Sequence, residues 1–253
     1  MDDHSTDETP SFLKEISQDK KIKTFVNLKN GPAAARNLGI RNSRGKIVIF
    51  LDDDAKASYN LICEYKKFFD NNPQYHGCYG PTMQENLLVK GKKYRRNRQE
   101  LNLKFFTVNL AVRRQVFKNI GLFDERFKFA ALEDIDFGKR FEKKGYLIGY
   151  NKKCKVIHKK FIILKELLNR SFVQGVQLKI FVKKWLNYDK IICCKFIFSS
   201  IYQYIKNLLT AFILRVKLLK NELNYSLYQK NEFTFSLYFI LYLFLQFIGF
   251  LFG

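Results

Sequence analysis

The chain has 253 residues, a net charge of +22 and a hydrophobic content of 47%. These values allow one large domain with a sizeable core, together with an appendage. The five cysteines lack metal-ligand spacing, which excludes a cysteine-based zinc site, and we expect them to be reduced thiols.

The positive charge is unevenly distributed along the chain. Residues 1–135 carry +7, whereas residues 136–253 carry +15 and are also rich in Phe, Leu, Ile and Tyr. Cations beside apolar residues suit an anionic membrane surface better than nucleic acid. We therefore expect a membrane partner and no nucleic acid. A basic nucleic-acid binder remains the rival interpretation, and it requires a basic face on the N-terminal domain itself.

The first sixty residues predict an alternation of helices and strands. A helix is expected from Pro10 to about Ser17 and a strand over Lys23–Asn27. Gly31 permits a tight turn before a second helix that starts at Pro32, and a strand follows over Ile47–Leu51. This order is typical of an α/β fold.

Three consecutive carboxylates, Asp52, Asp53 and Asp54, end the strand Ile47–Leu51. An apolar run without alternation suits a strand buried on both faces, and ligands bind beyond the carboxyl ends of such strands. Adjacent carboxylates repel one another unless a cation joins them. Oxygen ligands here suit Mg²⁺ or Mn²⁺, which can in turn hold a diphosphate. The alternative is a solvated acidic turn.

The middle of the chain continues the alternation. Helices are predicted over Leu61–Asp70 and Arg114–Ile120, and strands over Tyr75–Pro81 and Asn109–Val112. Between them, Lys90–Arg98 predicts a basic loop. Such a loop is usually a solvated face, and it can also face anionic lipid or an acidic acceptor.

A further acidic group opens a helix that ends at Gly145. Glu133, Asp134 and Asp136 fall in its first turn, where acids complement the helix dipole. Simple capping is therefore the alternative to a catalytic role. His158 follows a predicted strand and is interpreted either as a structural histidine or as a metal ligand.

Several of these segments resemble family 2 glycosyltransferases of the GT-A fold. MDDHSTDET resembles the "VDDGSTDxT" segment, GPAAARNLGI the "GxxxARNxGI" helix, and FLDDD the D-x-D motif. NLAVRRQVFKNIGLFDERF resembles "NxAVRRxVFxxIGGFDExF", and EDIDFGKRFEKKGY resembles "EDxDLxxRxxxxGY" with Phe137 in place of Leu. The resemblance covers about residues 2–160. It implies a GT-A domain over residues 1–160, with a Rossmann-like mixed sheet and flanking helices.

The resemblance also implies roles for matching positions. The residues expected to bind the nucleotide-sugar are Asp2, Asp3, Gly31, Ala34, Arg36, Asn37, Asp52 and Asp53. The metal, Mn²⁺ or Mg²⁺, is expected on Asp52, Asp54 and His158. Asp134 is the expected general base, with Glu133 and Asp136 as supporting candidates.

The implied activity is an inverting, metal-dependent sugar transfer. The donor is expected to be a UDP-sugar, and the acceptor a hydroxyl of a lipid-linked or cell-envelope glycan. The alternative is a catalytically impaired or non-catalytic nucleotide-sugar-binding protein at the membrane.

Residues 161–253 predict a basic, membrane-associated helical region. Phe161–Trp185 and Ile191–Leu219 are apolar stretches interrupted by Lys and Arg, as in interfacial helices. Residues 233–252 carry no charge and reach ~30 Å, which predicts a transmembrane helix with the catalytic domain on the cytoplasmic side. A buried core helix is the alternative.

Compared with the family pattern, the chain starts at the "DDHS" segment and lacks the usual strand–helix–strand before it. This departure predicts a truncated fold with an unpaired sheet edge and with Asp2 and Asp3 on a frayed terminus. A chain of this kind is expected to be unstable and nearly inactive.

Overall fold

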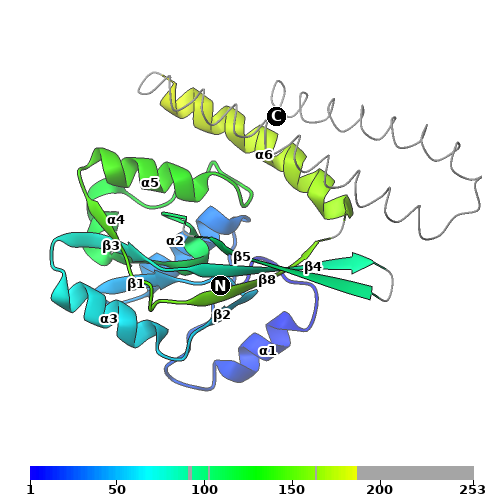
Figure 1. Cartoon of the computed structure of the whole chain (residues 1–253), viewed down its shortest axis with the longest axis horizontal. Coiled ribbons are helices and arrows are strands. Elements are labelled where there is room, and N and C mark those ends of the chain that lie inside the picture. Colours follow the sequence, from blue (N-terminus) through cyan, green and yellow to red (C-terminus); the bar gives the residue numbers. More distant parts are fainter. Residues whose placement is uncertain (91–92, 102, 163, 187–253) are drawn as a thin grey trace, which may run out of the picture. The chain divides into compact units, whose positions relative to one another are not determined.

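The computed structural model describes residues 1–90, 93–101, 103–162 and 164–186 (Figure 1). The chain divides into two units, Met1–Phe161 and Ile162–Gly253. The helices predicted over residues 191–219 and 233–252 lie outside the described residues.

The first unit alternates helices and strands, which confirms the predicted α/β class. Its helices are α1 (Thr9–Ile16), α2 (Pro32–Asn42), α3 (Leu61–Asn71), the 3-10 helix η1 (Thr107–Asn109), α4 (Arg114–Ile120) and α5 (Glu133–Lys143). Its strands are β1 (Ile47–Phe50), β2 (Ala55–Ala57), β3 (Tyr75–Tyr79), β4 (Thr82–Lys90), β5 (Lys93–Leu101), β6 (Leu110–Arg113), β7 (Leu147–Tyr150) and β8 (Val156–Ile162).

A four-stranded mixed sheet, in the order β1-β6-β3-β7, organises the first unit. β6 is antiparallel to both neighbours, and Val112 lies opposite Val48 on one side and Gly77 on the other. β3 and β7 are parallel. The carboxyl ends of β1, β3 and β7 therefore meet at one edge of the sheet, together with the start of β6. Asp52 follows β1 at this edge.

A second sheet, in the order β2-β8-β4-β5, begins just after the acidic segment. β2 pairs with β8 in antiparallel fashion, with Ala55 opposite His158. β4 and β5 form a long hairpin in which Lys90 lies opposite Lys93. The predicted basic loop over residues 90–98 is therefore wrong, because pairing with β4 makes most of this segment a strand. The hydrophilic composition of the segment gave no sign of this partner.

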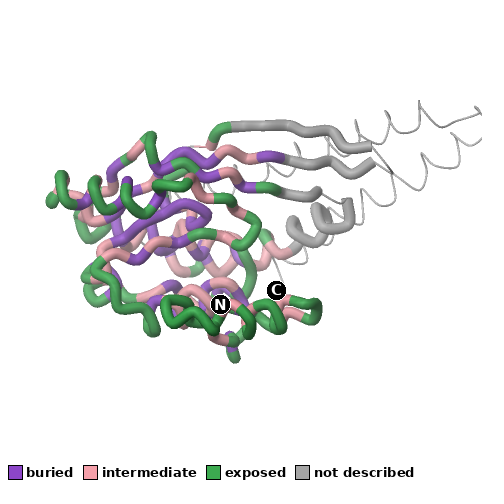
Figure 2. Tube along the Cα trace, turned by 90° about the horizontal axis from the view of Figure 1, so that it is seen from below, coloured by how far each residue is buried: buried purple, intermediate pink, exposed green. Residues whose placement is uncertain are grey.

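Two apolar cores flank the central sheet, and Figure 2 shows the buried trace between exposed helices. Val48 and Phe50 pack in the core that also contains Phe137, whereas Ile47 and Ile49 pack against the other core. β1 thus contacts apolar residues on both faces, as predicted. Each fully buried side chain of this size contributes ~1.5–3 kcal/mol to folding.

The N-terminal segment is held in place by backbone bonds. The Asp2 amide donates to the Phe25 carbonyl at 2.9 Å, and the Asn27 amide donates to the Asp2 carbonyl at 2.7 Å. Asp2 is 6% exposed. The expectation of a frayed terminus at Asp2 is therefore wrong. The predicted strand over Lys23–Asn27 is also wrong, because only Val26 makes a bridge, which is parallel, to Asp2.

In the second unit, the structure describes the helix α6 (Leu164–Trp185), which confirms the helix predicted over residues 161–185. No helix among the described residues combines the length and apolar character that a membrane span requires.

Candidate active site

An acidic cluster with a histidine lies at the carboxyl end of β1. Asp52, Asp54 and His158 each offer a ligand atom, and these atoms lie within 4.8 Å of one another. Nε2 of His158 is 2.9 Å from Oδ1 of Asp54. The pairing of β2 with β8 produces this approach, because Ala55, the residue after Asp54, lies opposite His158. The structure therefore brings together the three predicted metal ligands.

The donor set fits a divalent cation. Two carboxylate oxygens and an imidazole nitrogen suit Mn²⁺ and, less ideally, Mg²⁺. Burial raises the pKa of Asp52, and the charges of Asp54 and Asp53 raise it further, against the lowering effect of Arg36 and His158. A bound cation would offset this cost to the ionised carboxylate. The Asp54 side chain is 46% exposed, which leaves one side of the cluster open to ligand oxygens.

Arg36 connects this cluster to the start of α5. Its Nη2 lies 3.8 Å from Oδ1 of Asp52, and its Nη1 lies 2.6 Å from Oε1 of Glu133. Glu133 is 3% exposed, and its Oε2 has no hydrogen-bond partner in the part of the chain that the structure describes. A buried carboxylate of this kind depends on its cation partner, because an unpaired charge is costly away from water.

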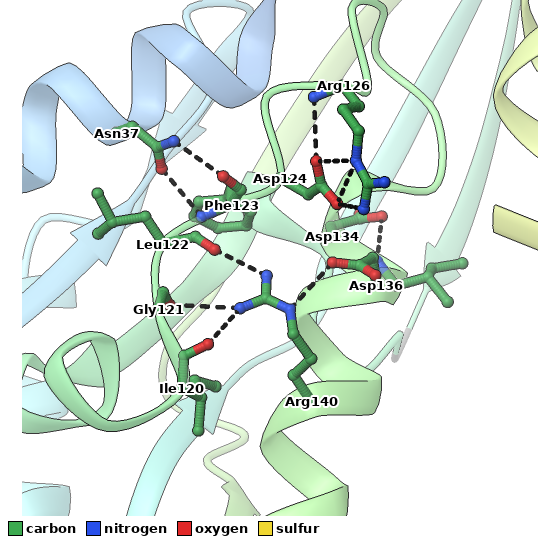
Figure 3. Close-up of polar contacts among 11 residues, drawn as sticks. Asn37, Ile120, Gly121, Leu122, Phe123, Asp124, Arg126, Asp134, Asp136 and Arg140 are labelled. Carbon is green, nitrogen blue, oxygen red and sulfur yellow. Dashed lines mark hydrogen bonds and ion pairs between the residues drawn. The ribbon is translucent and has the colours of Figure 1, made fainter. Parts of the chain in front are cut away.

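Asp134 is half-buried in the first turn of α5, directly after Glu133. Its Oδ1 accepts a hydrogen bond from the Ile135 amide at 2.8 Å (Figure 3). Burial, and then the neighbouring Glu133 charge, raise the pKa of Asp134 to about 7. A carboxylate with such a pKa is suited to accept a proton near neutral pH. Leu132, which precedes the helix, has a φ of 67°, an uncommon conformation that ends the preceding loop abruptly.

Asp136 makes different contacts from Glu133 and Asp134. It is fully buried, and its Oδ2 accepts a hydrogen bond from Nε of Arg140 at 3.0 Å (Figure 3). Arg140 also donates to the carbonyls of Ile120 at 2.7 Å and Leu122 at 2.8 Å. Asp136 thus orients an arginine that holds the loop after α4. These contacts favour a structural role for Asp136 over the predicted supporting role in catalysis.

The same loop is held from its other side by Asn37 on α2 (Figure 3). The Asn37 amide donates to the Phe123 carbonyl and to Oε1 of Glu125, both at 2.9 Å, and its oxygen accepts from the Phe123 amide. The hydrogen bond from Asn37 is the main reason that the pKa of Glu125 falls to about 2. Asn37 is fully buried, so these bonds occupy its side chain. Sequence reasoning missed Arg140 and Glu125, although both lie inside the motifs quoted for the resemblance.

The predicted nucleotide residues at the N-terminus gather at the start of α2. The Asp3 carboxylate accepts from the Gly31 amide at 2.9 Å and from Nδ2 of Asn27 at 2.7 Å. Gly31 has a φ of 101°, and a Cβ there would lie 2.4 Å from the Lys128 carbonyl oxygen. Only glycine fits this turn. Asn27 is a third residue that sequence reasoning missed.

The other predicted nucleotide residues lie around the acidic cluster and around the turn at Gly31. Asp2 is buried, and its Oδ1 accepts from the Ser5 amide at 3.0 Å. Ala34 is buried in α2. Asp53 is exposed, and its Oδ1 accepts from the Asp54 amide. The helix α2 joins the turn at Gly31 to the acidic cluster, since Gly31 precedes the helix and Arg36 lies within it.

A mixed α/β domain with an acidic cluster at a strand end has the arrangement expected of a GT-A-like transferase. Residues 1–132, just over half of the chain, match the family model described as glycosyl transferase family 2. The chain therefore belongs to glycosyl transferase family 2.

Curated relatives agree with this assignment. An uncharacterized glycosyltransferase of Rickettsia felis is 37% identical over 92 residues, which are 36% of this chain and 15% of that protein. The GalNAc(5)-diNAcBac-PP-undecaprenol beta-1,3-glucosyltransferase of Campylobacter jejuni is 29% identical over 185 residues, which are 69% of this chain and 56% of that protein. The chain thus matches only part of the length of these relatives.

Two solved structures share the fold. The mannosyltransferase PcManGT from Pyrobaculum calidifontis, in complex with GDP-Man and Mn²⁺, has a TM-score of 0.52 and 13% identity, covering 99% of this chain and 76% of its own. GalNAc-T7 with UDP, GalNAc and Mn²⁺ has a TM-score of 0.51 and 15% identity, covering 79% and 47%. At this identity the likeness shows a GT-A-like fold.

Proposed function

We propose that the chain transfers a sugar from a nucleotide-diphosphate sugar to a hydroxyl of a lipid-linked or cell-envelope glycan, with inversion at the sugar carbon. The observation that carries this proposal is the ion-pair chain from Asp52 through Arg36 to Glu133. This ion-pair chain links the acidic cluster to the first turn of α5, where Asp134 follows Glu133, and so supports one site that combines the proposed metal–diphosphate group with the proposed base.

The donor side rests on the acidic cluster and the turn before α2. Asp52, Asp54 and His158 would hold Mn²⁺ or Mg²⁺, which supplies Lewis-acid stabilisation of the departing diphosphate when bound. Asp3 and Gly31, both expected to bind the nucleotide-sugar, are joined by a hydrogen bond at the turn before α2. We propose UDP as the nucleotide on the resemblance of the MDDHSTDET and GPAAARNLGI segments to the family.

The acceptor side rests on Asp134. As the acceptor oxygen attacks the sugar carbon, its proton passes to the Asp134 carboxylate, and the bond from the sugar carbon to the diphosphate oxygen breaks. One displacement of this kind inverts the configuration at that carbon. Because the pKa of Asp134 is about 7, a large fraction is ionised and ready to accept a proton at neutral pH.

A lipid-linked acceptor is supported by the name of the Campylobacter relative, which contains undecaprenol. The basic and apolar composition of residues 161–253 supports membrane association, with the catalytic domain on the cytoplasmic side. Deleting residues 233–253 is expected to move much of the protein from the membrane pellet to the supernatant. Unchanged pelleting would assign the attachment to residues 161–219.

The test is a transfer assay on the full chain. UDP-, GDP- and dTDP-sugars are offered with Mn²⁺ and with undecaprenyl-diphosphate-linked acceptors, and the configuration of the new linkage is read by NMR. We expect turnover with a UDP-sugar and an inverted product. A retained configuration would exclude the single displacement. Tight nucleotide-sugar binding without transfer to any acceptor would favour the non-catalytic alternative.

A further inference from the structure

A cavity of ~450 Å³ lies between α3 and the segment that follows β7. Its lining residues belong to α3, to Asn72 directly after this helix, and to residues 150–153. None of them belongs to the acidic cluster or to the first turn of α5. Pockets that hold small ligands measure ~300–1,000 Å³, so this cavity has room for one or two sugar rings.

The cavity and the proposed base lie on opposite faces of the central sheet. α3, which forms one wall of the cavity, contributes Tyr65 and Phe69 to one core, whereas α5 contributes Phe137 to the other (Figure 1). In the order β1-β6-β3-β7, three strand spacings of ~4.8 Å also separate β7 from β1, which amounts to ~14 Å. A ligand in this cavity would therefore leave the acidic cluster and α5 open.

The two walls of the cavity are fixed by the fold. Nδ2 of Asn151 donates to the Glu64 carbonyl at 3.3 Å, which joins the segment after β7 to α3. Oδ1 of Asn151 accepts from the Lys153 amide at 3.0 Å. The Phe68 ring packs directly on β7, because a Cβ at Gly149 would lie 2.3 Å from its Cζ. A site whose walls are already ordered loses less conformational entropy when a ligand binds.

The lining combines cations, carboxamides and one buried carboxylate. Glu64 is 7% exposed, and its Oε1 lies 3.6 Å from Nζ of Lys67. Lys152 and Lys153 are exposed, and neither forms an ion pair within the described part of the chain. The polar lining is completed by three carboxamides, those of Asn71, Asn72 and Asn151. A hydroxyl both donates and accepts, so it pairs with a carboxylate or a carboxamide, whereas ammonium groups favour an anion.

We propose that this cavity binds an acidic saccharide. The sugar hydroxyls would contact Glu64 and the carboxamides, and the carboxylate or phosphate of the ligand would contact Lys152 and Lys153. An inorganic anion would use the ammonium groups alone and would be repelled by the Glu64 carboxylate. A neutral sugar would leave both ammonium groups without a partner.

A nucleotide matches the cavity less well than an acidic saccharide does. Its phosphate would suit the lysines, but its base needs an aromatic face on which to stack. Both rings of the lining already pack against other rings, Phe68 against Tyr75 at 5.5 Å and Tyr150 against Tyr79 at 5.2 Å. The carboxamides suit several hydroxyls better than one base.

Calorimetric titration of the full chain in EDTA tests the ligand class. The probes are digalacturonate, glucose 6-phosphate, neutral cellobiose and inorganic phosphate. We expect at least one acidic sugar to bind ~5-fold or more tightly than cellobiose and inorganic phosphate. The tighter of the two acidic sugars identifies the anionic group as a carboxylate or a phosphate. No binding of either acidic sugar, or equal binding of cellobiose or inorganic phosphate, would overturn the proposal.

A pair of charge variants tests the role of the lysines. One variant carries Lys152→Gln and Lys153→Gln. The matched control carries Lys20→Gln and Lys21→Gln, which are also adjacent exposed lysines and lie after α1. We expect affinity for the tighter-binding acidic sugar to fall ~5-fold or more in the first variant alone. An equal loss in both variants would show a general effect of charge and overturn the proposal.

A pair of tryptophan variants tests the position. Asn71→Trp fills the cavity from the exposed last residue of α3, and Ile62→Trp places the same side chain at an exposed position of that helix outside the lining. We expect Asn71→Trp to lose binding of the acidic sugar and Ile62→Trp to keep it. Parent-like binding by Asn71→Trp would place the ligand elsewhere and overturn the proposal. Far-ultraviolet circular dichroism of all the variants is expected to match that of the parent.

Two further readouts separate this site from its alternatives. UMP that binds more tightly than both acidic sugars, and that loses affinity in the Lys152–Lys153 variant and in Asn71→Trp, would assign the cavity to a nucleotide and overturn the proposal. The Lys152–Lys153 variant is expected to keep the transfer rate of the parent to a neutral acceptor. Normal transfer without binding of an acidic sugar overturns this site and leaves the proposed function intact. Absent transfer in the parent with the expected sugar binding has the opposite meaning.

Discussion

Arg36 on α2 and Glu133 on α5 form an ion pair of 2.6 Å that joins the acidic end of β1 to the helix of Asp134. Burial and then the Glu133 carboxylate raise the pKa of Asp134, whereas the Arg36 guanidinium lowers it. The proton affinity of the proposed base thus depends on its burial and on two charged neighbours that also hold each other in place.

The role of Asp134 is tested by Asp134→Asn, which keeps the shape of the side chain and removes its basicity. Donor binding is expected to survive, and kcat is expected to fall by ~10²–10⁴. Steady-state transfer kinetics and nucleotide titration give the two quantities. Asp70→Asn, on the exposed face of α3, is the control and should behave as the parent. Normal turnover of Asp134→Asn would move the role to Glu133 or Asp136.

The pH dependence follows from the raised pKa of Asp134. The base must be ionised, so kcat is expected to rise as pH increases through about 7 and to level off above it. Glu133→Gln removes a negative neighbour and leaves Arg36 to act on Asp134, and both effects lower its pKa. The rising limb should therefore move to lower pH. Glu142→Gln, exposed on the same helix, should leave the limb in place. If Glu133→Gln moved the rising limb of the pH–kcat profile to higher pH, this electrostatic account would be contradicted.

The acidic cluster predicts that substitutions of the neighbouring residues Asp53 and Asp54 have different effects on metal-dependent binding of UDP. Asp54→Ala removes a ligand that lies 2.9 Å from His158, and Mn²⁺-dependent binding of UDP is expected to be lost. Asp53 is exposed and lies outside the cluster, so Asp53→Ala should keep the Mn²⁺ dependence. Calorimetric titration of UDP with Mn²⁺ and with EDTA measures both. Equal UDP affinity in Mn²⁺ and EDTA for the parent chain would exclude a metal role here.

The buried hydrogen bonds of Asn37 predict that replacing this residue destabilises the fold. Asn37→Ala leaves the buried Phe123 amide and carbonyl without their partner, so the free energy of unfolding should fall by ~2–3 kcal/mol. Asn42→Ala on the same helix removes one exposed bond to the Leu38 carbonyl and gains the same helix propensity. It should change stability little. Urea denaturation gives both values, and similar results for the two variants would show that Asn37 does not anchor the loop.

The parts of the molecule that could be predicted from sequence are those that local pattern determines. The continuous apolar run of β1 indicated a strand with two buried faces, and the acids after it indicated a cluster at the sheet edge. The start of α5 was indicated by three acids in one turn. In each case the residues that carry the signal are adjacent, so no knowledge of distant partners was needed.

The parts that could not be predicted depend on distant partners. β5 is a strand because β4 pairs with it, and its own composition suggests a loop. The roles of Asn37 and Arg140 follow from backbone groups of residues 120–123, which lie many positions away in the chain. Asp2 is held by backbone groups of residues 25–27, which its position near the start of the chain does not suggest.

The placement of β6 between β1 and β3 has a consequence for the order in which the domain folds. β1 and β3 both pair with β6 and not with each other, although both precede it in the chain. On the ribosome, the first strand must therefore wait for Leu110–Arg113 to emerge before it gains its hydrogen-bonding neighbour. Non-local pairing of this kind slows folding and leaves strand edges open meanwhile. The hydrogen-bonding edge of β1 is accordingly left without this partner in the nascent chain until residues 110–113 have emerged.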